Sequence, residues 1–535
     1  VSQNYVDQYD YYIQPSLEYQ TKIKNHGIQA LFLYEYGGVK YTSMSAGKRG
    51  YPVDDILDLS WGDEVIPNSV LGIHNQSKRG GYVARLNYDY ADKYLVEISG
   101  RIDGSTLLPS KNRWCVFPGV SLGWRISEES FIKDNVDLNF IDNLKLRASF
   151  GQLGSQTGLG YGISYMSLAS LSDKPNVALG STLKRYLNIG SIPNEDLKWQ
   201  YTNTYNIGFE AMFWKGLLGV EFDMFYSLTK RKIEAQSGSY PPSLGGYYSS
   251  LVNSGEHENK GFELVLTHQN KIGEVNYSIK GNLSWARNKI LKINETTNVP
   301  NAKRLVGKPM GQYFGFVSDG LFQSEEEIAN SAVFGPTLPG DIKLVDINGD
   351  AKITMEQDMV PIGRSNIPEM TYGLNLSANW KGFDFNAFFQ GSALFDVYLC
   401  GSYPGAGWVD DTFYTRPFYA DGNAPYYLVE GAWTPENRNA KYPRLSTEAR
   451  LNGGKYSDWW VKNGTYIRLK NAQIGYTLPA ELTRKVGIEK VRAYVSGSNL
   501  FTLTGVKYFD PEMPNVNQGY YPQQRVYEFG LNITF

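Results

Sequence analysis

The sequence is poor in cysteine and histidine, the residues that most often build cross-links and transition-metal centres. Its 535 residues include only two cysteines and four histidines. A disulfide framework needs several cysteines, and a zinc site needs clustered cysteine or histidine ligands. None of the histidines forms an H-E-x-x-H pair. The sequence therefore predicts neither a disulfide-stabilised scaffold nor a His/Cys metal centre.

An excess of one charge and a long apolar run are also absent. Lys and Arg number 52 against 54 Asp and Glu, which gives a net charge of -2. A nucleic-acid binder needs a basic field that displaces counterions, so we expect no nucleic-acid partner. No apolar run approaches the ~18 to 20 residues of a membrane helix, and the mean hydropathy is -0.38. Helical membrane proteins are thereby excluded.

Tyrosine and glycine are abundant instead. Aromatic residues make up 14% of the chain, with 40 Tyr against 25 Phe, and there are 55 Gly. A typical protein contains only about 7% Gly. A chain rich in Tyr and Gly, yet mildly hydrophilic, is typical of a membrane β-barrel, because only every second residue of a strand meets lipid.

Alternation of apolar and polar residues recurs along the whole chain. In 143–150 the apolar face holds Leu144, Leu146, Ala148 and Phe150, and the polar face holds Asn143, Lys145, Arg147 and Ser149. Such runs keep their parity for about 8 to 11 residues, whereas soluble strands average ~5 to 6. A tilted strand needs ~9 to 11 residues to cross a bilayer. We therefore expect lipid outside and a water-filled lumen, lined by polar residues such as Arg147, inside.

The alternation predicts fifteen strands, at 15–23, 28–36, 81–90, 94–103, 115–126, 143–152, 201–213, 217–229, 258–268, 274–289, 369–380, 383–398, 464–477, 490–501 and 525–535. Parity slips near Lys470-Asn471, which predicts a bulge. Tight links such as 214–216 alternate with long ones such as 291–368. This is typical of an all-β fold, a transmembrane antiparallel β-barrel with short periplasmic turns and long extracellular loops. The longer links 127–142 and 479–488 favour short helical turns.

Fifteen strands is an odd number, and bacterial single-chain barrels have an even number. Missing strands would leave open edges in lipid, which a bilayer does not tolerate. We therefore expect residues 1–535 to be the C-terminal portion of an outer-membrane β-barrel. Residue 1 would then lie in an extracellular loop, and the first strands would precede it.

Several blocks, taken in order, resemble the SusC/RagA family of TonB-dependent outer-membrane transporters. They include Gly80-Gly81-Tyr82, Arg101-Ile102-Asp103-Gly104-Ser105, Gly123-Trp124-Arg125, Leu144-Lys145-Leu146-Arg147, Gly340-Asp341-Ile342, Tyr466-Ile467-Arg468-Leu469-Lys470-Asn471 and Asn499-Leu500-Phe501. The resemblance implies a 22-stranded barrel in the outer membrane of a Gram-negative cell, with a plug domain inside. It further implies energy from TonB through the plug segment, and a SusD-like surface lipoprotein as a lid. The plug and seven strands would lie outside this chain.

The function that the resemblance implies is the import of glycans or peptides, and the sequence does not distinguish the two. A passive porin or a barrel adhesin is the alternative, and a plug segment or a need for TonB would separate them. A surface hydrolase would require paired carboxylates, but Asp410 and Asp411 are adjacent and point opposite ways if extended. The run Gly119–Gly123 matches G-x-S-x-G but lies inside an alternating strand. We expect no enzyme, no catalytic residue and no cofactor beyond one metal ion.

The metal candidate lies in an outer loop. Asp346, Asn348 and Asp350 place oxygens at positions 1, 3 and 5 of a calcium-loop pattern, with Asp358 as the late acid. The pattern departs from the rule at Ala351, where glycine is expected, and Asp358 comes one position late. The loop would hold either a structural calcium ion or nothing, as an Asx-rich turn.

Aromatic residues crowd the long loops. Flat rings above a lumen can stack on sugar faces or on peptide side chains at small entropic cost. The candidates for contact with substrate or lipoprotein are Tyr247, Tyr248, Trp408, Tyr414, Tyr426 and Trp433. The alternatives are an outer aromatic girdle against the outer-membrane lipid or packing of the loops on themselves.

Overall fold

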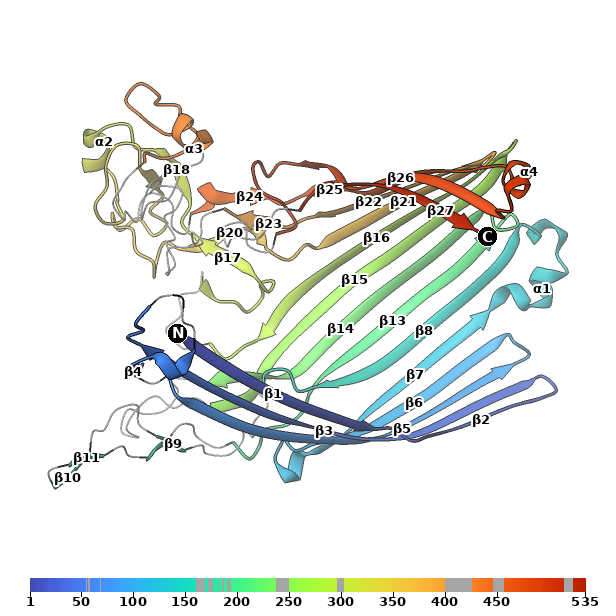
Figure 1. The fold of residues 1–535 in the computed structure, drawn as a ribbon, viewed down its shortest axis with the longest axis horizontal. Helices are drawn as coiled ribbons and strands as arrows, with labels where there is room; N and C mark the ends of the chain where they lie inside the picture. The colour runs from blue at the N-terminus through green and yellow to red at the C-terminus, as the bar shows by residue number, and fades with distance from the viewer. Residues whose placement is uncertain are drawn as a thin grey trace.

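A computed structural model describes the chain except for residues 54, 56, 57, 68, 160–168, 172–176, 181, 185, 186, 190–193, 237–249, 296–302, 400–425, 446–456 and 514–522. Most of the described chain forms one curved antiparallel sheet (Figure 1). None of the described residues form a helix that is long and apolar enough to span a membrane.

The sheet contains seventeen strands among the described residues. In order across the sheet they are β1 (Ser2–Ile13) and β2 (Ser16–Ile23), both on β3 (His26–Arg49), then β5 (Leu71–Tyr90), β6 (Tyr94–Ser105), β7 (Trp114–Arg125), β8 (Ile141–Ser155), β13 (Gln200–Phe213), β14 (Leu218–Gln236), β15 (Ser250–Ile272), β16 (Val275–Lys292), β21 (Met370–Trp380), β22 (Phe383–Ala393), β25 (Tyr466–Thr477), β26 (Lys490–Thr504) and β27 (Val526–Thr534), with β4 (Glu64–Val65) added to β3.

This arrangement confirms the fifteen predicted strands. Strands β1 and β2 follow one another along the same edge of β3, and β4 is a two-residue addition. The described sheet is therefore fifteen strands wide. Among the described strands, β27 pairs with β26 alone, while β1 and β2 pair with β3. The curved sheet therefore has two free edges.

Several strands are longer than the alternation predicted. Strand β3 has 24 residues and β15 has 23, against ~9 to 11 for a membrane crossing. Residues 2–13, which were predicted to precede the first strand, form β1. Pro15 separates β1 from β2, since proline has no backbone N–H for the ladder. Strands of this length exceed the thickness of a bilayer, so part of each must extend beyond the lipid, where alternation of apolar and polar residues is no longer required.

One end of the sheet carries tight turns, and we call it the turn end (Figure 1). At the β5–β6 and β13–β14 turns, non-glycine residues adopt left-handed backbone, with φ of +56° at Ala91 and Asp92 and +55° at Trp214. Two such residues in succession make the turn that matches strand twist. The helical turns α1 (Ser130–Lys133) and α4 (Ala480–Thr483) lie at this end, as the sequence predicted.

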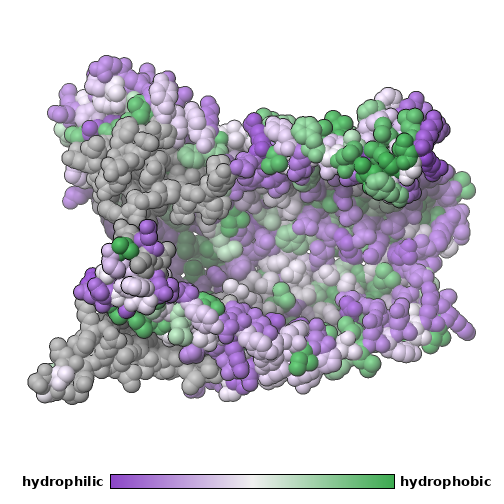
Figure 2. Space-filling model, viewed as in Figure 1, coloured by the Kyte–Doolittle hydropathy of each residue, from purple (hydrophilic) through white to green (hydrophobic). Residues whose placement is uncertain are grey.

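The two faces of the sheet differ in polarity as predicted. On the outer face, Ile98 and Ile207 have 56% and 63% of their surface exposed. On the inner face, Arg147 of β8 forms ion pairs with Glu210 of β13 and Asp223 of β14. Figure 2 shows hydrophilic residues lining much of the hollow inside the curved sheet. The sheet thus presents an apolar outside and a polar inside.

The largest apolar core lies in the loops at the other end, which we call the loop end. Phe316, Leu321, Ile342, Leu428 and Trp460 are buried together there. They belong to a loop block built from residues 303–369, 426–445 and 457–463. Its elements are β17 (Gln312–Gly315), β18 (Ser318–Leu321), β19 (Ile342–Leu344), β20 (Val360–Ser365), β24 (Val461–Asn463), which pairs with β23 (Asp396–Tyr398), α2 (Glu325–Ala329) and α3 (Tyr426–Glu430).

A second loop excursion lies between β8 and β13. It contains two small antiparallel pairs. These are β9 (Ala169–Leu171) with β12 (Leu187–Ile189), and β10 (Val177–Leu179) with β11 (Thr182–Lys184). Both pairs belong to the loop end, where Figure 1 also shows α2 and α3. The long connections therefore gather at one end of the sheet and the short ones at the other.

Candidate functional site

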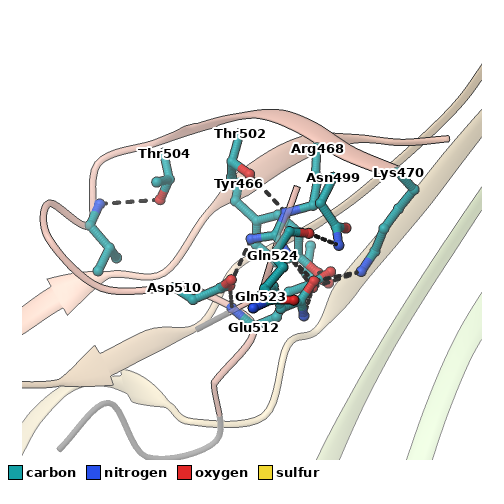
Figure 3. A network of polar contacts seen from close by, with 12 residues as sticks. Tyr466, Arg468, Lys470, Asn499, Thr502, Thr504, Asp510, Glu512, Gln523 and Gln524 are labelled. Atoms are coloured by element: carbon teal, nitrogen blue, oxygen red, sulfur yellow. Dashed lines mark hydrogen bonds and ion pairs between the residues drawn. The ribbon is translucent and has the colours of Figure 1, made fainter. Parts of the chain in front are cut away.

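A polar network at the loop end connects the sheet wall to the segment that follows β26 (Figure 3). We call this the Arg468 network. Arg468 of β25 donates from Nη2 to Asp510 Oδ1 at 2.7 Å and from Nη1 to Glu512 Oε2 at 2.6 Å. Its Nε donates to Thr502 Oγ1 of β26 at 2.7 Å. Only 3% of the Arg468 side chain is exposed, so one buried guanidinium holds the 505–513 segment against the wall.

Further donors converge on Glu512. Lys470 Nζ lies 2.8 Å from Glu512 Oε2, and the hydroxyl of Tyr466 donates to Oε1 at 3.0 Å. The ladder shifts register between Leu469 and Asn471, at the predicted bulge. A bulge re-aims side chains at strand ends, and here Arg468 and Lys470 both reach the same carboxylate.

The charges around Glu512 determine its titration. Burial raises the pKa of the Glu512 carboxyl, but the hydrogen bonds from Lys470 and Tyr466 and the charge of Arg468 outweigh burial. The net result is a pKa below the ordinary value, so Glu512 is ionised at neutral pH. The carboxylate therefore completes a charge-assisted network rather than serving as a proton donor.

The same segment also contacts the loop block. The rings of Tyr427 and Tyr508 stack with centroids 3.9 Å apart and planes 2° from parallel. Tyr508 has a left-handed backbone, with φ of +69°, which is uncommon for a bulky residue and needs support from its surroundings. The loop block, the 505–513 segment and the wall are thus joined in series.

The predicted aromatic residues fall into two groups. Tyr247, Tyr248, Trp408 and Tyr414 lie outside the described residues. Tyr426 and Trp433 lie in the loop block, and Tyr426 has 76% of its surface exposed. The Trp433 indole donates to Gln323 Oε1 at 3.2 Å, and its ring lies so close to Gly340 that a Cβ there would clash. Contact of either residue with substrate or lipoprotein stays a prediction.

The calcium candidates do occur in one loop, and backbone N–H groups occupy their oxygens. Asp346 accepts from Gly349 and Ala351. Asp358, which is fully buried, accepts from Ile347 and Thr354. Within the part of the chain that the structure describes, no three His, Cys, Asp or Glu residues are grouped to hold a metal ion. Calcium binding stays a prediction.

The G-x-S-x-G motif, for which we predicted no catalytic role, is part of a strand. Gly119–Gly123 lies wholly within β7, between ladders to β6 and β8, and forms no strand-to-helix turn. Asp410 and Asp411 lie outside the described residues.

Sequence reasoning missed the Arg468 network and the Tyr508 stack. Arg468 and Lys470 belonged to a block that carried the family resemblance, which was a usable signal. Asp510 and Glu512 belonged to another block of the same resemblance, but no local pattern connected the two blocks, since Arg468 and Asp510 are 42 positions apart. Tyr508 gave no signal, because its role depends on a backbone conformation.

Comparison with known proteins agrees with this architecture. Residues 2–500 match the family model described as "TonB dependent receptor-like, beta-barrel". The chain is 28% identical over 550 residues to the TonB-dependent receptor P26 of Formosa agariphila, covering 97% of this chain and 52% of that protein. It is 25% identical over 476 residues to the TonB-dependent receptor SusC of Bacteroides thetaiotaomicron, covering 85% of this chain and 43% of SusC.

Solved structures show the same fold. The RagAB peptide importer in its "open-open" state matches with a TM-score of 0.78 at 22% identity, covering 100% of this chain and 55% of the matched chain. The RagAB peptide transporter matches with a TM-score of 0.77, also at 22% identity. The chain spans about half the length of these relatives. It belongs to the TonB-dependent receptor-like β-barrel family, and it is a multi-pass β-barrel protein of the outer membrane.

Proposed function

We propose that this chain forms the wall of an importer that carries oligosaccharides or peptides across the outer membrane. The import would be energised by TonB, and a SusD-like lipoprotein would cover the extracellular mouth. The observation that carries the proposal is the family match across residues 2–500, with SusC among the relatives. The loop end is then extracellular and the turn end periplasmic.

The wall has the properties that such an importer requires. Its inner face is polar, and ion pairs such as Arg147 with Glu210 join neighbouring strands across the lumen surface. Ion pairs of this kind keep the lumen surface hydrated and hold neighbouring strands in register. A lumen of about 22 strands is too wide to stay open, so the proposal requires a plug and further strands from outside these 535 residues.

The wall would be static while other parts move. The Arg468 network and the Tyr427–Tyr508 stack hold the extracellular loops to the wall. Capture would occur among these loops, beneath the lipoprotein, and TonB would pull on the plug to open a path. The side chains described here carry no chemical step in this scheme, in keeping with relatives that are receptors and transporters rather than enzymes.

The substrate class stays open between oligosaccharide and peptide. The RagAB structures are those of a peptide transporter, but an identity of 22% supports only the fold. Exposed aromatic residues such as Tyr426 suit either class of ligand.

The alternative is a passive porin or an adhesin, and dependence on TonB separates the three. The full-length protein would be expressed in the outer membrane of a Gram-negative host with and without TonB, and uptake of labelled oligosaccharides and peptides would be measured. We expect uptake that stops without TonB. Equal uptake in both hosts would indicate a porin, and no uptake in either would indicate an adhesin.

The proposed SusD-like lipoprotein can be tested separately. The full-length protein, purified in mild detergent, should bring with it a lipoprotein of the SusD family, identified by mass spectrometry. TonB-dependent uptake by cells that lack any such lipoprotein would contradict the lid while leaving the importer intact.

A further inference from the structure

A hollow of about 580 Å³ lies in the inner wall of the barrel, towards its extracellular end. Strands β3, β5, β6, β7 and β8 supply most of its lining, and Trp199 lies beside it. Its charged side chains are Glu35, Arg79, Arg101 and Asp103. Arg79 and Arg101 have the parity of the inward-facing residues of β5 and β6, so the hollow opens to the lumen.

The two carboxylates that line the hollow already accept hydrogen bonds from other side chains of the wall. Glu35, only 4% exposed, accepts from the Tyr12 hydroxyl at 2.5 Å and from Arg101. Asp103 accepts from Arg101 Nε through both oxygens, at 2.7 and 2.6 Å. The four charges of the hollow sum to zero, so it does not repel an anion.

Two hydrogen-bond donors of the hollow, by contrast, have no acceptor among the described residues. Arg79 is exposed, and the part of the chain that the structure describes offers its guanidinium no hydrogen bond or ion pair. Its guanidinium carbon lies 5.6 Å from the centre of the Tyr12 ring. Gln156 lines the same hollow, and its buried Nε2 has no hydrogen-bond partner among the described residues. A guanidinium offers five N–H donors in a planar fork that suits a carboxylate.

The hollow is preformed. The Trp199 indole donates to the Arg113 carbonyl at 2.8 Å, and its ring meets Phe117 edge to face at 5.5 Å. Gly119 and Gly151 contribute backbone to the lining of the hollow. A Cβ at Gly119 would meet Ser99 Oγ at 2.7 Å, whereas a Cβ at Gly151 would meet nothing within 4 Å. The packed Trp199 ring and the open space at Gly151 leave room for a ligand group in the hollow.

We propose that this hollow binds a carboxylate of the transported molecule. Arg79 is the bidentate donor to the carboxylate oxygens, and the Gln156 amide becomes a second donor when its side chain turns into the hollow. The inference rests on the importer proposed above and adds one feature to its substrate, an acidic group. An acidic sugar or an acidic amino-acid side chain supplies the same chemistry.

The test uses the purified full-length protein and two matched pairs of probes. One pair is tetragalacturonate and its methyl ester, and the other is acetyl-Ala-Glu-Glu-Ala-amide and its Gln counterpart. Titration calorimetry should show that one acidic probe binds at least tenfold more tightly than its neutral counterpart. Arg79→Gln should remove that preference, and Arg79→Lys should restore part of it. The probe that binds identifies the source of the carboxylate.

Two control variants make the test specific. Arg231→Gln removes a similar guanidinium, which lies 5.3 Å from the Tyr201 ring and outside the hollow, and should leave binding unchanged. Gly151→Leu should fill the hollow and weaken acid binding with the charges intact. Gly72→Leu, at another strand glycine with open space, should have no effect.

Three results would overturn the inference. They are equal affinity for acidic and neutral probes, acid binding that survives Arg79→Gln, and no binding of either acidic probe. TonB-dependent uptake combined with any of them would refute the carboxylate site alone. Arg79-dependent acid binding together with uptake that ignores TonB would refute the energised importer alone.

Discussion

Tyr427 of the loop block and Tyr508 of the 505–513 segment stack face to face, with ring centroids 3.9 Å apart. The two residues come from different extracellular loops. Behind Tyr508, Asp510 and Glu512 of the same segment bind Arg468 of the wall. A displacement of the loop block is therefore resisted by a continuous path of contacts that ends in β25.

The stack should show measurable coupling. We predict that Tyr427→Ala and Tyr508→Ala each loosen the loop block, and that a double-mutant cycle yields a coupling free energy of about 0.5 to 1.5 kcal/mol. Hydrogen exchange of residues 426–430 in the full-length protein would measure it. Strictly additive effects of the two substitutions would show that the rings do not stabilise each other.

Loss of the buried guanidinium should release the 505–513 segment. Arg468→Met leaves the carboxylates of Asp510 and Glu512 without their main partner, and breaking a buried pair costs about 3 to 5 kcal/mol. Hydrogen exchange of 505–513 should accelerate accordingly. Lys470→Met is the matched control, because Glu512 keeps Arg468, and it should cost about 1 kcal/mol or less. Equal effects of the two variants would contradict the central place of Arg468.

The attachment of this segment should weaken in acid. The pKa of Glu512 in the folded protein is below its ordinary value of ~4.3. Its contribution to stability is therefore fully present above the unfolded pKa and is lost as the pH falls through the folded pKa. Hydrogen exchange of 505–513, corrected for intrinsic rates, should rise below about pH 4.3 in the native protein. In Glu512→Gln the same exchange should already be fast at pH 7 and should change little with acid.

The two faces of β13 should tolerate charge differently. Ile207 lies at the middle of the strand on the outer face, and Asn206 precedes it on the inner face. Ile207→Arg should cost about 2 to 4 kcal/mol of unfolding free energy, as for cations at the bilayer midplane. Asn206→Arg should cost much less, because water solvates it. Urea titration of the full-length protein refolded in liposomes would measure both, and similar costs would contradict the assignment of the faces.

The sequence predicted the strands well because the bilayer imposes a strict alternation over each crossing. The fifteen strands, the bulge beside Lys470 and the helical turns at α1 and α4 all follow from local patterns. Extensions such as residues 37–49 of β3 were missed, since beyond the lipid their outer face need not be apolar.

The site was less predictable, for a different reason. The contact between Arg468 and Glu512 joins a strand to a distant loop, and no local pattern specifies such a pairing. The hollow beside Arg79 depends on the space that neighbouring strands leave open at Gly151, which is a property of the assembled wall. Composition pointed to aromatic loops, but four of the six chosen residues lie outside the described chain.

Direct measurement of the environment along one strand tests the central claim, that lipid covers one face of the wall and water the other. Single cysteines at positions 95–102 of β6, in the full-length protein in liposomes, would carry a fluorophore that brominated lipid and aqueous iodide can quench. We predict that brominated lipid quenches labels at Val96, Ile98 and Gly100, and that iodide quenches those at Glu97, Ser99 and Arg101. Quenching without this two-residue period would contradict the account.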